Sequence, residues 1–132
     1  MDATAALERL RDISSQVQTA VVFDRAGKVL GSTLVDEGRS AEIAREAREL
    51  LGAAEARGGH IGSEFAQLEV ALQGGSVFVV RHEDRVIAAT TPPEPTVGLV
   101  FYDLKSCLRE LEEAPKPKRA PRSKAKKSDA GP

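Results

Sequence analysis

The chain has 132 residues, a length typical of one domain, and its 41% hydrophobic content without tryptophan predicts a core of aliphatic side chains. The single cysteine, Cys107, excludes an internal disulfide and suits the reducing cytoplasm. No apolar run approaches the roughly 20 residues that span a bilayer, so we expect a cytoplasmic protein without membrane insertion.

The net charge of −1 conceals an uneven distribution of charge. Residues 115–132 carry seven Lys and Arg residues against one Asp, a charge of +6, which leaves −7 for residues 1–114. The tail has no aliphatic residue larger than Ala, so it cannot bury enough surface to offset its ordering entropy. We therefore expect a folded domain over residues 1–114 and a disordered basic tail over residues 115–132.

Residues 2–15 predict a helix, because their apolar side chains recur at helical spacing opposite Arg and Glu. The alternation of residues 17–24 predicts a strand, and the β-rich run 28–34 predicts its antiparallel partner. Between them, Asp24-Arg25-Ala26-Gly27 is typical of a hairpin turn in which glycine adopts a positive φ.

The turn residues also spell D-x-x-G, a motif with which small GTPases contact magnesium and the γ-phosphate. A nucleotide site of that kind needs the phosphate cradle G-x-x-x-x-G-K-[ST]. Val22 stands where the first glycine of the cradle would be, Val29 follows Lys28, and the base-reading motif N-K-x-D is absent. We therefore interpret the string as a turn, and we predict neither enzymatic activity nor a cofactor.

A second helix is predicted over 41–57, with Ser40 as its N-cap. Its predicted apolar stripe consists of Ile43, Ala47, Leu50, Leu51 and Ala54. The glycine-rich loop that follows, residues 57–64, contains His60 and could be imagined to hold phosphate. Phosphate loops of that type precede a helix, whereas a strand follows here, so we interpret this loop as a connector.

Three further strands are predicted over 65–73, 76–82 and 86–91, joined by tight turns. Thr96 is predicted to cap a last helix, whose apolar stripe runs from Val97 to Leu111. The order α-β-β-α-β-β-β-α is dominated by hairpins. It predicts an α/β (α+β) fold with a single five-stranded antiparallel sheet and helices on both faces.

Candidate catalytic and metal-binding residues are few. His60 and His82 are the only imidazoles, Cys107 is the only thiol, and none has a partner at metal-ligand spacing. Cys107 falls on the apolar stripe of the last helix, which favours core packing. We therefore predict no catalytic residue and no metal site, although a Cys/His pair remains open geometrically.

The second helix offers a candidate interaction surface. Its interleaved Glu and Arg residues suit a solvated face with ion pairs one turn apart. Small residues such as Ala41 and Gly52 would also let a partner helix approach closely, and strand 65–73 is a candidate sheet edge, which is a template for pairing. These features suggest a two-fold dimer in which the strand edges of two copies pair and their second helices lie antiparallel over the joined sheet. The candidate dimer or partner contacts are Ala41, Ala44, Arg45, Arg48, Phe65, Gln67 and Glu69.

The basic tail has two interpretations. It is either a solubilising end or an electrostatic attachment to nucleic acid, an acidic protein or an anionic membrane. It has no aromatic side chain to stack on bases and no apolar face to enter lipid, so such binding would depend on salt and be weakly specific. The charges concerned are Lys116, Lys118, Arg119, Arg122, Lys124, Lys126 and Lys127.

Several segments between about residues 3 and 113 resemble the roadblock/dynein light chain family, including its bacterial members. The matching features are the leading amphipathic helix, the hairpin "TAVVFDRAGKVLGST", the Ala- and Leu-rich central helix, the block "LEVALQGGSVFVVRHEDRVIAATT" and the closing helix "VGLVFYDLKSCLREL". The resemblance implies a fold related to longin and profilin-like folds. It also implies a homodimer or heterodimer that binds small GTPases or serves as an adaptor subunit, without catalytic residues.

Our first hypothesis is a non-enzymatic dimeric protein that binds a small Ras-like GTPase or a related signalling complex. The alternative is a nucleic-acid-associated accessory protein anchored by the basic tail. A third possibility, an enzyme using Cys107 or His60, has no local signature to support it.

Overall fold

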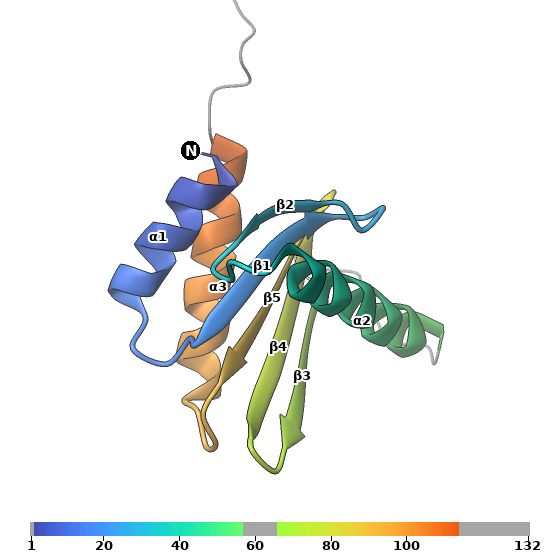
Figure 1. Cartoon of the computed structure of the whole chain (residues 1–132). Coiled ribbons are helices and arrows are strands. Elements are labelled where there is room, and N and C mark those ends of the chain that lie inside the picture. The colour runs from blue at the N-terminus through green and yellow to red at the C-terminus, as the bar shows by residue number, and fades with distance from the viewer. Residues whose placement is uncertain (1, 57–65, 114–132) are drawn as a thin grey trace, which may run out of the picture.

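The computed structural model describes residues 2–56 and 66–113, and its elements follow one another in the predicted order (Figure 1). Three predicted features lie outside the described residues: His60 with its loop, Phe65, and the tail at 115–132. The elements are α1 (Ala3–Ile13), β1 (Thr19–Asp24), β2 (Val29–Ser32), α2 (Glu37–Ala56), β3 (Ala66–Leu72), β4 (Gly75–His82), β5 (Arg85–Thr91) and α3 (Val97–Glu113).

The five strands form one antiparallel sheet in the order β2-β1-β5-β4-β3. Its centre joins distant parts of the chain, because β1 pairs with β5 from Thr19↔Thr90 to Asp24↔Arg85. β2 and β3 are the two edges, and α2 connects them by crossing one face of the sheet (Figure 1). Gly75 closes the β3–β4 turn with a φ of 153°, where a Cβ would collide with the Thr91 carbonyl oxygen.

Helices cover both faces of the sheet, as the apolar strands predicted. Ala20 and Val22 of β1 join the core under α1 and α3, whereas Val21 and Phe23 join the core under α2. Successive residues of a strand point to opposite faces, so β1 has to be apolar at every one of these positions.

The D-x-x-G string forms the β1–β2 turn, as predicted. Asp24 Oδ1 accepts hydrogen bonds from the backbone N–H groups of Ala26 and Lys28, at 3.0 and 2.9 Å. Gly27 has a φ of 95°, in the left-handed region that favours glycine. The Asp24 carboxylate therefore holds the turn through its backbone.

The beginning of α2 differs from the prediction. The helix starts at Glu37, and Asp36 Oδ1 accepts a hydrogen bond from the Arg39 N–H at 3.1 Å. Ser40 is buried, and its hydroxyl is bonded to the Asp36 carbonyl oxygen and the Ser32 hydroxyl. The prediction of Ser40 as the cap was wrong because Asp36 caps the helix one turn earlier. Gly38 costs only about 1 kcal/mol in a helix and does not end it.

The face that α2 turns to the sheet also differs in part. Leu50 of α2 was predicted to lie in the core, but 37% of its surface is exposed. The same difference occurs at the start of α3, where Val97 has 38% of its surface exposed. The prediction placed the larger apolar residues of α2 against the sheet. In the structure, small side chains fill much of that contact and let the helix lie close to the sheet. The buried residues of α2 are Ser40, Ala44, Ala47 and Leu51.

Candidate interaction surface

The outer side of α2 carries three of the predicted contact residues. Ala41, Arg45 and Arg48 are all exposed, and an ion pair of 2.9 Å joins Arg39 to Glu42 on the same helix. Gly52 is exposed as well, and a Cβ added there would meet nothing within 4 Å. As far as the described residues go, the side of α2 around Ala41, Arg45 and Gly52 is open to a partner.

Ala44, the fourth predicted helix residue, is not available to a partner. Its exposure is 0%, and it belongs to the core cluster that includes Val21 and Phe23 of β1. Small size allows a close neighbour but does not say which one, and at Ala44 the neighbour is the sheet of the same chain. We therefore remove Ala44 from the candidate contacts.

β3 is an edge strand, as predicted, and pairs only with β4 within the described ranges. Gln67 and Glu69 lie opposite Val80 and Phe78 in the register. Directly opposed residues share a face, and those two partners belong to the core under α1 and α3. The predicted strand contacts therefore lie on the opposite face of the sheet from α2, so the structure does not bring the two predicted groups together.

The residues of β3 that share a face with α2 are apolar. Leu68 packs against the core under α2, Val70 is half-buried, and Leu72 has 59% of its surface exposed. The signal that could have identified them is the apolar alternation of the strand, which separates them from Gln67 and Glu69.

Exposed apolar side chains on both elements indicate where a partner would bury surface. We use the name α2–β3 surface for Leu50 of α2 together with Leu68, Val70 and Leu72 of β3. It combines an open helix side with an open strand edge, and both features are used in protein–protein recognition.

Within the described residues, the Cys107 thiol is not activated as a nucleophile. Cys107 is buried in the core between α1 and α3, as predicted, and burial raises its pKa to about 12, with a smaller contribution from the Glu110 carboxylate. The thiol is therefore protonated at neutral pH, which makes it a poor nucleophile. His82 is buried at the end of β4.

Neither a metal centre nor a membrane span is found in the part of the chain that the structure describes. No group of three or more His, Cys, Asp or Glu side chains there could hold a metal ion. None of the described helices has the length and apolar character needed to cross a bilayer.

The same arrangement of helices and strands occurs in known proteins. Residues 4–91 match the sequence profile of the Roadblock/LC7 domain. A Roadblock/LC7 domain from Streptomyces avermitilis superposes with a TM-score of 0.72 at 21% identity, covering 85% of this chain and 96% of that one. MglB from Myxococcus xanthus has a TM-score of 0.62 at 18% identity, covering 83% of this chain and 84% of its own.

The gliding protein MglB from Thermus thermophilus has a TM-score of 0.59 at 17% identity, with coverage of 83% and 84%. No relative was found among curated protein sequences. At these identities, the likeness to the solved structures shows a shared fold.

Proposed function

Because this chain belongs to the Roadblock/LC7 domain family, we propose that it is a non-enzymatic dimeric adaptor or regulator that binds a small Ras-like GTPase. The family resemblance implies this class of partner. The observation that carries the proposal is the α2–β3 surface, which consists of an open strand edge at β3 and exposed residues of α2, the helix that covers one face of the same sheet.

The dimer forms at the β3 edge. An edge strand presents unpaired backbone N–H and C=O groups, and a second copy of the same strand satisfies them about a two-fold axis. This pairing would continue the sheet from one copy into the next. It would also bury part of the exposed surface of Val70 and Leu72.

The dimer is tested by sedimentation velocity over a micromolar concentration series. We expect the full chain to be a dimer and Leu72→Lys to weaken it at least about tenfold, because a charge on an edge strand opposes pairing. The control is Leu99→Lys, which replaces an exposed leucine of α3 (49% exposed) away from β3 and leaves the dimer intact. A full chain that stays monomeric throughout the series would overturn this part of the proposal.

In this proposal, the chain provides a binding surface for the GTPase, and the GTPase itself binds and hydrolyses the nucleotide. Asp24 of the D-x-x-G string is engaged by backbone amides of its own turn. On α2, the exposed charges of Glu46 and Glu49 flank the partly exposed Leu50, and Arg45 is exposed on another side of the helix. Polar residues around an apolar patch are the usual composition of a protein interface.

The partner is tested by capturing proteins from source-cell lysate, supplied with GDP or a slowly hydrolysed GTP analogue, and identifying them by mass spectrometry. We expect a small GTPase, with recovery reduced about tenfold by Arg45→Glu, because charge reversal at an interface opposes association. Arg11→Glu, on the exposed side of α1, is the control. Recovery of no GTPase in either nucleotide state would contradict the partner assignment while leaving the dimer untouched.

A second candidate function follows from the charge distribution. With +6 on residues 115–132 and −7 on residues 1–114, the tail can anchor the chain to nucleic acid. A gel shift over a salt series, with and without residues 115–132, distinguishes this function. Binding that persists after the tail is removed would reject the tail as the anchor.

A further inference from the structure

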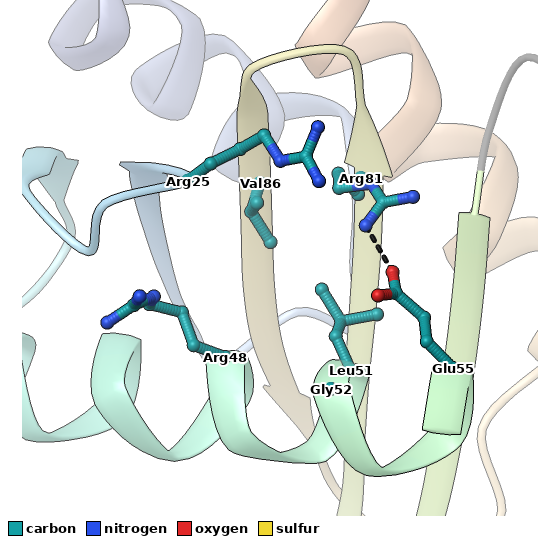
Figure 2. A pocket seen from close by; sticks show the side chains of 7 residues that line it. All are labelled: Arg25, Arg48, Leu51, Gly52, Glu55, Arg81 and Val86. Atoms are coloured by element: carbon teal, nitrogen blue, oxygen red, sulfur yellow. Dashed lines mark hydrogen bonds and ion pairs between the residues drawn. The ribbon is translucent and has the colours of Figure 1, made fainter. Parts of the chain in front are cut away.

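A hollow between the C-terminal half of α2 and the neighbouring end of the sheet gathers three arginines (Figure 2). Its volume is about 170 Å³, and Leu51 and Val86 supply its apolar lining. This is well above the roughly 10–15 Å³ that admits one water, yet below the roughly 300–1,000 Å³ of sites for drug-sized ligands. The hollow therefore suits a small ion.

The charges around the hollow are not balanced. Arg25, Arg48 and Arg81 bring three positive charges, and among the described residues of the lining the only acidic one is Glu55, which forms an ion pair with Arg81. Figure 2 shows Arg25 reaching from the β1–β2 turn over Val86, with its guanidinium directed toward Arg81. Two like charges that face the same space repel one another unless an anion lies between them.

Packing restricts two of the three arginines, whereas Arg25 is exposed. The side chain of Arg81 is only 14% exposed. Arg48 lies against the β1–β2 turn, so closely that a Cβ added at Gly27 would stand 3.0 Å from Arg48 Nη1. Because folding has already restricted Arg48 and Arg81, these two residues lose less side-chain entropy on binding an anion than free surface arginines would.

We propose that this arginine hollow binds a phosphate-type oxyanion, held between Arg25 and Arg81 with Arg48 at the rim. The surplus of two positive charges matches a phosphate group, which carries about −1.5 to −2 at neutral pH, better than a single carboxylate. Guanidinium forks also suit the bidentate recognition of phosphate oxygens. The site goes beyond the proposed GTPase adaptor role, because Arg25 and Arg81 are not part of the α2–β3 surface.

The Glu55 carboxylate lowers the affinity of this site for an anion. Its carboxylate occupies Arg81 and adds a negative charge to the lining of the hollow. Glu55→Gln removes that charge while keeping the shape of the side chain. This variant therefore binds phosphate more tightly than the natural chain, whereas removal of an arginine weakens binding.

The test is an amide-resolved NMR titration of the full chain with inorganic phosphate at constant ionic strength. Amides of Gly52 and the β1–β2 turn report the hollow, and amides of residues 115–132 report binding to the basic tail separately. Glycerol phosphate in a second arm distinguishes a phosphomonoester from the free ion, and acetate in a third arm measures a carboxylate.

We expect saturable shifts at the hollow, an affinity about tenfold weaker in Arg25→Ala, and an affinity several-fold tighter in Glu55→Gln. The matched control Arg11→Ala, an exposed arginine on α1, leaves the affinity unchanged. Binding of either phosphate probe with this pattern supports the proposal. Non-saturating shifts, shifts confined to the tail, insensitivity to Arg25→Ala, or acetate binding as tight as phosphate would overturn it.

Discussion

Asp24, Asp36 and Asp103 carry the same carboxylate in three different surroundings. Asp24 holds the β1–β2 turn and Asp36 caps α2, each by accepting hydrogen bonds from backbone N–H groups. Asp103 is buried in α3, where burial raises its pKa and a hydrogen bond with Ser14 partly offsets that rise. The sequence predicted the first role from the turn pattern, but the other two depend on where the helix begins and which side it buries.

Cys107 gives a residue-scale prediction about alkaline pH. Its folded pKa of about 12 exceeds the ordinary value of 9.0, so above pH 9 the unfolded thiol loses its proton while the folded thiol keeps it. The folded state then binds more protons, and the free energy of unfolding falls as pH rises from 9 toward 12, by at most about 1.4 kcal/mol per pH unit.

The measurement is urea unfolding of the natural chain and Cys107→Ala across this pH range. Subtracting the two pH slopes removes contributions from other groups that titrate there. We expect the slope to be shallower in Cys107→Ala, even though that variant is less stable overall because of its cavity. Identical slopes would mean that the thiol is not protected by burial.

Element order follows from local patterns, whereas element placement does not. Periodicity predicted every helix and strand, because burial on a helix or strand repeats at fixed spacing. The central pairing of β1 with β5 joins residues between 61 and 71 positions apart, for which no local pattern exists. The small residues of α2 were likewise ambiguous, since Ala44 could face either the sheet or a partner.

The start of α2 gives a prediction at the scale of one element. Asp36→Ala removes the side-chain acceptor for the Arg39 N–H, which leaves a helix-end donor without its partner. We expect Asp36→Ala to lower the free energy of unfolding, measured in urea, by about 1 kcal/mol. Asp36→Asn keeps an oxygen acceptor, so its free energy of unfolding should be close to that of the natural chain. An unchanged stability in Asp36→Ala would show that another group caps the helix.

For the whole molecule, the two-sided sheet explains why the candidate contacts were only partly predictable. The sequence indicated a helix and a strand edge as the contact elements, and the structure places both at the molecular surface. It could not show that Gln67 and Glu69 lie on the α1/α3 face while Arg45 lies on the α2 face. Successive side chains of a strand point to opposite faces of the sheet. A shift of one position therefore moves a side chain to the other face, where it contacts a different set of helices or partners.

Division of the chain into a folded domain and a tail gives the last prediction. The described core residues end at Leu111 and α3 ends at Glu113, so a variant that stops at residue 114 retains both core clusters. We expect its melting temperature to lie within about 2 °C of the full chain in high salt, because residues 115–132 have no aliphatic side chain larger than Ala with which to stabilise the core.

At low salt, the opposite charges of residues 1–114 and 115–132 attract each other, so a small extra stability of the full chain should appear there and vanish as salt is added. Circular dichroism melts of both chains across a salt series measure the two effects. A large loss of stability that persists in high salt would instead mean that residues 115–132 pack against the domain, and the boundary at 114 would have to move.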